Sequence, residues 1–149
     1  MAFTFRLQAI YHWRKNLEEL SQLRLAGYLK ALAGQEERME KLRETRKAYE
    51  GECRHKAGQG AAVSDLLLYL DYFDDSFQKL EVLEQERKRN LKVIETERRK
   101  LLDLTRERKI LEKLKERELK KFLAAQEKKE RKATDDLVVQ RHPGSRKGI

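Results

Sequence analysis

The residue types that most often carry out chemistry are few and scattered in this chain. Its three histidines are His12, His55 and His142, and its single cysteine, Cys53, lies two residues before His55. A structural zinc site needs about four ligands, and this pair supplies only two. The favoured interpretation is a cysteine in a helix seam beside an exposed histidine, so no metal is expected.

The glycines at Gly58 and Gly60 do not form a phosphate-binding loop. Such a loop has the pattern G-x-x-x-x-G-K-[ST], and no Lys-Ser or Lys-Thr follows Gly60. Catalysis also needs side chains that converge in a pocket, which long helices do not readily provide. We therefore expect no catalytic residue, no cofactor and no small-molecule substrate, and predict that the chain is not an enzyme.

The elements that must position any functional residue are two long helices. Residues 61–142 contain neither glycine nor proline, and the first proline is Pro143. Glycine and proline are the strongest breakers of local structure, so the glycines at positions 51, 58 and 60 leave one break in the chain. The sequence predicts a first helix at 1–58, a turn at 59–63, a second helix at 64–138 and a flexible tail at 139–149.

The composition favours a coiled coil over a thick core, with 41% charged and 7% aromatic residues and a mean hydropathy of -0.89. A short turn makes consecutive helices antiparallel neighbours. The predicted fold is all-α, with two long helices in an antiparallel coiled-coil hairpin. In the turn, the glycines are expected to adopt the left-handed conformation that ends a helix, and Ser64 to cap the second helix.

Heptad spacing predicts which residues pair across the hairpin. At the start of the first helix, the apolar set Ile10, Trp13, Leu17 and Leu20 lies one residue out of phase with the seam predicted for the rest of that helix. A coiled coil that drifts slightly absorbs such a shift. The predicted seam of the first helix is Leu25, Tyr28, Leu32, Gln35, Met39, Leu42, Arg46, Tyr49 and Cys53. The predicted seam of the second helix is Leu66, Leu70, Phe73, Phe77, Leu80, Glu84, Arg87, Leu91, Ile94, Arg98, Leu101 and Thr105.

Gly27 and Gly34 lie seven residues apart on nearly the same helix face. They would let a partner helix approach closely, or they are glycines that the helix merely tolerates.

Positive charge is concentrated in one stretch of the second helix. Residues 87–132 hold 19 Lys and Arg against 9 Asp and Glu, a net charge of +10, whereas the whole chain carries +9. This indicates an acidic partner, although a solvated helix face explains a basic run equally well. Nucleic acid is disfavoured, because the stretch has only Phe122 as an aromatic residue and no recognised binding motif.

The chain is expected to be cytoplasmic. A single cysteine excludes an intramolecular disulfide, and the N-terminal residues show no secretion signal. The longest apolar cluster, residues 66–70, is far shorter than the roughly 20 residues of a membrane-spanning helix, so no span is expected.

Several segments together resemble the flagellar export protein FliJ family over essentially the whole chain. They are the start Phe3-Thr-Phe5-Arg-Leu7 with Ile10 and Arg14, the pair Ala48-Tyr49, the cluster Tyr69-Leu-Asp-Tyr72-Phe73, the run Arg108-Lys-Ile-Leu-Glu-Lys-Leu-Lys-Glu-Arg117, and Asp135-Asp136. The resemblance implies a hairpin similar to the central stalk subunit of rotary ATPases. It also implies a component of the flagellar type III export apparatus at the inner face of the cell membrane.

The partners implied by the resemblance are the flagellar export ATPase hexamer, the membrane export gate protein and flagellar substrate chaperones. The end bearing both termini would enter the ATPase ring through Phe3, Phe5, Leu7, Arg108, Lys109, Lys113 and Arg117. Residues nearer the turn would contact the gate, namely Leu42, Tyr49, Tyr72 and Phe77, unless the seam buries them. The alternatives are a structural coiled-coil dimer and a basic coiled coil that binds nucleic acid.

Overall fold

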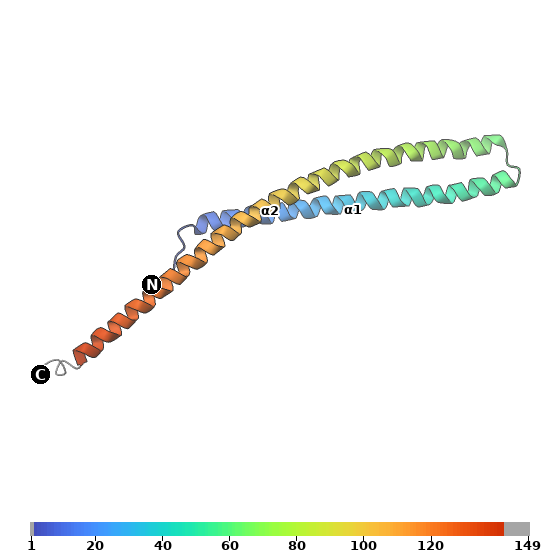
Figure 1. Cartoon of the computed structure of the whole chain (residues 1–149). Coiled ribbons are helices and arrows are strands. Elements are labelled where there is room, and N and C mark those ends of the chain that lie inside the picture. The colour runs from blue at the N-terminus through green and yellow to red at the C-terminus, as the bar shows by residue number, and fades with distance from the viewer. Residues whose placement is uncertain (1, 142–149) are drawn as a thin grey trace. The chain divides into compact units, whose positions relative to one another are not determined.

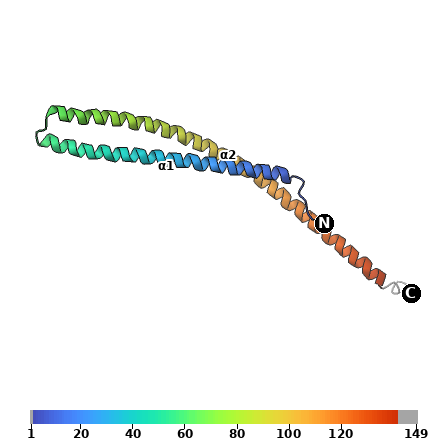
Figure 2. The same cartoon turned by 180° about the vertical axis from the view of Figure 1, so that it is seen from behind.

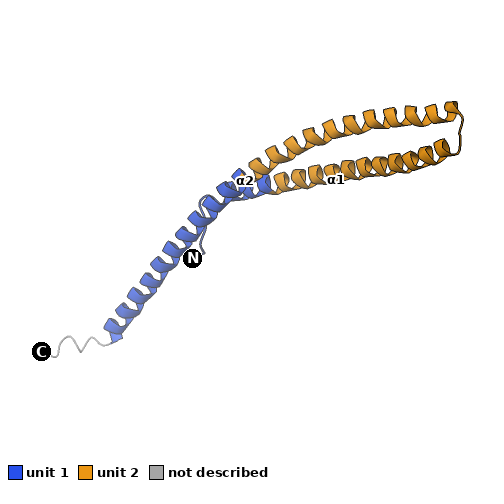
Figure 3. Cartoon of the chain, turned by 45° about the vertical axis from the view of Figure 1, so that its right-hand side comes forward, with its two compact units in different colours: residues 1–18, 103–149 blue, residues 19–102 orange. Residues whose placement is uncertain are grey.

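The computed structural model describes residues 2–141, which form two helices and no strand. Helix α1 spans Gln8–Gly58 and α2 spans Val63–Arg141. The chain divides into two compact units (Figure 3). Unit 1 comprises the segments up to Glu18 and from Asp103 onward, and unit 2 is Glu19–Leu102. In unit 2, α1 and α2 lie side by side in opposite directions (Figures 1 and 2), which confirms the predicted all-α antiparallel hairpin.

Gly60 ends α1 in the manner that its sequence predicts. Its φ is 78°, in the left-handed region, whereas Gly58 remains helical. The amide of Gly60 donates to the carbonyl oxygen of Ala57 at 3.3 Å and that of Ala61 donates to Lys56 at 3.0 Å. These two bonds satisfy the last carbonyl groups of the helix, as in a Schellman motif.

The helix ends differ from the predicted ranges. The first helix begins at Gln8, not residue 1, and α2 continues to Arg141, so residues 139–141 of the predicted tail are helical. Residues 142–149 of that tail, with His142, lie outside the described residues. The prediction of Ser64 as a helix cap is wrong, because α2 begins one residue earlier and the Ala62 carbonyl accepts from Asp65.

The seam of α1 keeps one register throughout. Of the apolar set upstream, Ile10, Trp13 and Leu20 are exposed and Leu17 is half-buried, contrary to the predicted phase shift. Tyr11, Arg14, Glu18 and Ser21 take the inward positions instead, and they continue the three-four steps of the downstream seam. The reason lies in the polar side chains of α2: Ser21, for example, donates to the buried Glu97 at 2.9 Å.

The seam of α2 also differs from the prediction, because Leu70, Phe77, Leu91 and Arg98 were predicted inside and are exposed, whereas Glu84 is half-buried as predicted. Ser76, Asn90 and Glu97 are buried or half-buried where Phe77, Leu91 and Arg98 were predicted. In unit 2 the inward positions of α2 are Leu66, Tyr69, Phe73, Ser76, Leu80, Leu83, Arg87, Asn90, Ile94, Glu97 and Leu101. The seam of the hairpin therefore contains polar as well as apolar residues.

Gly27 and Gly34 do not mark a close approach between helices. A Cβ atom added at either position would meet no atom within 4 Å. Of the two interpretations of these glycines, the structure supports the one in which the helix merely tolerates them.

Candidate functional site

A polar network joins the two helices inside unit 1. The carboxylate of Glu18, whose side chain is only 9% exposed, accepts hydrogen bonds from the guanidinium of Arg108 and from the hydroxyl of Thr105. Arg108 also binds Glu112, and the Tyr11 hydroxyl donates to Glu112 at 3.0 Å. Because these groups satisfy one another between α1 and α2, the network fixes the pairing of the helices in this unit.

Proton affinities in the network follow from these contacts. Hydrogen bonding to Glu18 raises the pKa of Arg108 despite the opposing effect of burial, and Glu112 adds to the rise. Burial by itself would raise the pKa of Glu112, but hydrogen bonds from Arg108 and Tyr11 bring that pKa below its ordinary value. Burial and the bond to Glu112 raise the pKa of Tyr11. The network therefore contains a cationic Arg108 and an anionic Glu112 at neutral pH.

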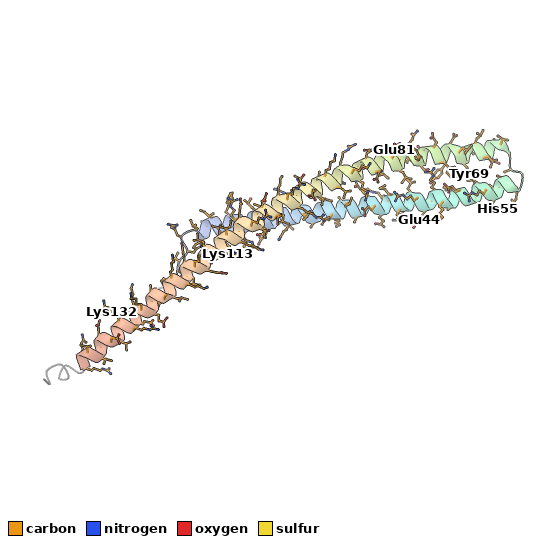
Figure 4. The ribbon with its side chains drawn as sticks, viewed as in Figure 1. Glu44, His55, Tyr69, Glu81, Lys113 and Lys132 are labelled. Carbon is orange, nitrogen blue, oxygen red and sulfur yellow. The ribbon has the colours of Figure 1, made fainter. Side chains whose placement is uncertain are left out.

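The basic residues predicted to face the ATPase fall into two groups. Arg108 is committed to the network, and its side chain is 21% exposed. Lys109, Lys113 and Arg117 are exposed, and none of them takes part in an ion pair within residues 2–141. Figure 4 marks Lys113 and, farther along α2, Lys132. These three residues, 109, 113 and 117, are called the exposed cations below.

Of the apolar residues predicted to face the ATPase, Phe3 contacts α2 and the other two are buried or half-buried. Phe5 is 4% exposed, and Leu7 is half-buried. The ring of Phe3 is tilted against that of Phe122, with centroids 5.6 Å apart. Their packing brings the segment before α1 beside α2, so the exposed cations lie on the same unit as the N-terminal residues.

The residues predicted to face the export gate lie in unit 2. Tyr49 and Tyr72 pack edge to face with centroids 4.7 Å apart, and Leu42 is half-buried. Phe77, by contrast, is 55% exposed, and the guanidinium carbon of Arg46 lies 5.9 Å from its ring centroid. Of this set, Phe77 has the most accessible apolar surface.

An aromatic pocket of about 290 Å³ lies near the turn. Figure 4 marks Tyr69 on α2, whose ring centroid is 6.3 Å from that of Tyr49 on α1. Lys56 Nζ lies 5.3 Å from the Tyr69 centroid, a distance suited to cation–π attraction. The pocket is lined by Tyr49, Lys56, Asp65, Leu68, Tyr69 and Tyr72.

Sequence reasoning missed the exposed apolar residues of α1. Ile10, Trp13 and Leu20 are 46%, 54% and 49% exposed, and they share one helix face. Their three-four spacing is visible in the sequence, but spacing alone assigned them to the seam. Only the polar partners on α2 show that a different face of α1 is buried.

No cluster suited to a metal ion was found among the described residues. Within residues 2–141, no three side chains of the types His, Cys, Asp and Glu converge. Cys53 is half-buried and His55, marked in Figure 4, is exposed. His12 is exposed, and its Nε2 atom lies 3.0 Å from the side-chain Nε2 atom of Gln8. In the same range, neither helix has a stretch apolar and long enough to cross a membrane.

Comparison with known families identifies the chain. The family model described as "Flagellar FliJ protein" matches residues 3–147. Searches of curated proteins and of solved structures gave no match. The match covers nearly the whole chain, and it confirms the resemblance to this family that the sequence motifs indicated. The chain therefore belongs to the flagellar FliJ protein family, which implies a role related to flagellar export.

Proposed function

We propose that the chain is a non-enzymatic cytoplasmic component of the flagellar type III export apparatus. Unit 1 enters the ring of the export ATPase hexamer and promotes its assembly or turnover, while unit 2 links the ring to the membrane export gate and to substrate chaperones. The observation that carries the proposal is the set of exposed cations on unit 1 of a FliJ-family chain.

Electrostatics gives this proposal its physical basis. The exposed cations lie on one face of α2, and within residues 2–141 no carboxylate forms an ion pair with them. A basic surface of this kind attracts an acidic cavity over about 10 Å at moderate ionic strength. Attraction at that range raises the rate of encounter and weakens as salt is added.

Adding the purified chain to a flagellar export ATPase is expected to increase ATP turnover, with a maximum below one chain per ATPase subunit. A single hairpin occupies the axis of a ring, so substoichiometric amounts suffice. Turnover is measured during the titration, and light scattering after size exclusion gives the oligomeric state of the chain. A stable dimer that leaves turnover unchanged would instead support the structural coiled coil.

The gate contact rests on the aromatic residues of unit 2. Phe77 presents apolar surface on α2, and the packed pair Tyr49 and Tyr72 lies in the same unit. Large aromatic side chains are common anchors of protein–protein contacts. Phe77 is therefore assigned the central place in the contact with the gate.

Replacing Phe77 with Asp is expected to weaken binding to the cytoplasmic domain of the gate protein by about tenfold or more. Burying a phenylalanine contributes about 1.5–3 kcal/mol, and the aspartate would bury a charge instead. Isothermal titration with the gate domain measures the change in Kd. Leu123→Asp serves as the matched control because Leu123 is similarly exposed, at 53%, but belongs to unit 1. Equal Kd values for wild type and Phe77→Asp would contradict this contact.

A further inference from the structure

Along α2 in unit 2, polar residues face inward while apolar neighbours face solvent. Ser76 is 1% exposed, but Phe77 is 55% exposed. The same contrast occurs at the half-buried Asn90, which precedes the exposed Leu91. At these two pairs the pattern opposes the hydrophobic effect, which favours the apolar side chain inside. Seven residues before Phe77, Leu70 is also exposed, beside the half-buried Tyr69.

The inward polar residues differ in whether they bind across the seam. Asn90 donates to the side chain of Gln35 at 2.7 Å, which is a good hydrogen bond between the helices. Ser76 donates its one hydroxyl hydrogen to the carbonyl of Phe73 in its own helix, at 3.0 Å. On α1, the Nε atom of Arg46 is buried without a hydrogen bond, and its ion-pair partner is Glu50 on the same helix, at 3.7 Å. No hydrogen bond between the helices therefore holds Ser76 or Arg46 Nε in this register.

A small rotation of α2 would exchange the two sets of residues. Successive residues of an α-helix are about 100° apart around its axis. A rotation of α2 by about 50° about that axis therefore moves Phe77 into the seam and Ser76 out of it. The same turn brings Leu70 and Leu91 inward. The residues Leu66, Phe73, Leu80, Arg87 and Ile94 stay in the seam under both arrangements.

We propose that unit 2 has two packings of the same helices, which differ by this rotation of α2. In the polar-seam packing, which the structure shows, Ser76 and Asn90 face α1. In the apolar-seam packing, Phe77, Leu70 and Leu91 face α1. The rotation loses the Asn90–Gln35 and Ser21–Glu97 bonds and exchanges Leu83 for Glu84 and Glu97 for Arg98, and these losses offset the apolar gain. The offset keeps both packings accessible, since packed helices have discrete alternatives.

The rotation controls which surface unit 2 presents. The apolar face of Phe77 and Leu70 is available only in the polar-seam packing. A partner that covers this face binds one packing and shifts the population towards it. The inference does not depend on what that partner is, so it stands apart from the proposed gate contact.

The experiment measures how often Ser76 becomes accessible. In a full-length Cys53→Ser background, Ser76→Cys introduces a near-isosteric thiol in the seam, and Ile94→Cys introduces one at a position that both packings bury. Ile94 is 2% exposed. Each variant is labelled with a water-soluble maleimide at several low urea concentrations. The opening constant from labelling is compared with the same variant's own unfolding constant from urea titration.

The Ser76→Cys thiol is expected to open at least about tenfold more often than its variant unfolds, with little dependence on urea, because a rotation exposes little surface. The Ile94→Cys thiol is expected to be labelled only as fast as its variant unfolds. Adding Phe77→Gln to Ser76→Cys is expected to slow labelling at least about fivefold, since glutamine gains little by entering the seam.

Two results would overturn the proposal. If the Ser76→Cys thiol is labelled only through global unfolding, unit 2 has a single packing. If it is labelled rapidly but Phe77→Gln leaves the rate unchanged, the exposure comes from local unfolding and not from an exchange of Ser76 with Phe77. Circular dichroism of each variant confirms that the compared chains are equally helical.

Discussion

Reversing the exposed cations, as Lys109→Glu, Lys113→Glu and Arg117→Glu together, is expected to raise the concentration that half-stimulates the export ATPase about 30-fold. Each exposed charge contributes up to about 1 kcal/mol, and three reversals would lose about 2 kcal/mol in total. Turnover is measured against chain concentration at two ionic strengths. Salt should weaken stimulation by the wild type more than by the variant, because the variant has lost the attraction that salt screens.

The matched control for this triple variant reverses three exposed cations of unit 2, as Lys30→Glu, Arg38→Glu and Lys47→Glu. Both variants change the net charge equally, so only the place of the change differs. The control is expected to stimulate turnover as the wild type does. If the two variants shift the half-stimulating concentration by the same amount, net charge and not the basic surface of unit 1 governs the encounter.

Arg108→Met is expected to lower the free energy of unfolding by about 2 kcal/mol, which corresponds to a Tm lower by about 5 °C. The substitution leaves the carboxylate of Glu18, 9% exposed, without its cationic partner. Removing one member of a fully buried ion pair costs about 3–5 kcal/mol, and the partial exposure of Arg108 reduces this cost. Urea unfolding followed by circular dichroism measures the difference. For the same reason, reversing Arg108 would confuse loss of structure with loss of ATPase contact.

Arg106→Met provides the control on the same helix. The Arg106 side chain is 67% exposed, and its nitrogen lies 3.8 Å from Asp103, so this pair contributes less than about 0.5 kcal/mol. The double variant Glu18→Leu with Arg108→Met should recover most of the lost stability, because it removes both charges. Equal destabilisation by Arg108→Met and Arg106→Met would show that the network does not hold unit 1 together.

The pH dependence gives a second measure of the network. The pKa of Glu112 is below its ordinary value of 4.5 in the folded chain, so its contribution is present above that value and is lost as the pH falls through the folded pKa. Arg108→Met removes one of the hydrogen bonds that lower this pKa. The difference in unfolding free energy between wild type and variant should therefore shrink below about pH 4.

Much of the fold could be predicted because backbone preferences are local. The absence of glycine and proline from residues 61–142 predicts an uninterrupted second helix, and α2 is continuous over its whole described length. The left-handed turn at Gly60 was also foreseeable, because only glycine adopts a φ of 78° without steric cost. The start of α1 could not be predicted from local preferences: residues 2–7 lie outside the helix, where Phe5 is buried and Phe3 packs against Phe122 of α2.

The candidate site could be predicted only in part. The sequence places Lys109, Lys113 and Arg117 in a basic stretch, and the structure shows their side chains exposed. The sequence does not distinguish Arg108, which the network holds, from these exposed neighbours. The separation appears only because Glu18, 90 residues away in sequence, lies across the seam from it.

The sequence by itself determined that this chain is a hairpin of two long helices and that it resembles the FliJ family. Both follow from residue types and spacing along the chain, which need no knowledge of contacts. Only the tertiary structure decided which helix faces are buried. Heptad spacing identifies stripes that differ by one residue, and Phe77 was predicted inside where Ser76 lies instead. The choice between such stripes depends on pairs far apart in sequence, such as Gln35 with Asn90 and Ser21 with Glu97, whose hydrogen bonds form only when the two helices are packed together.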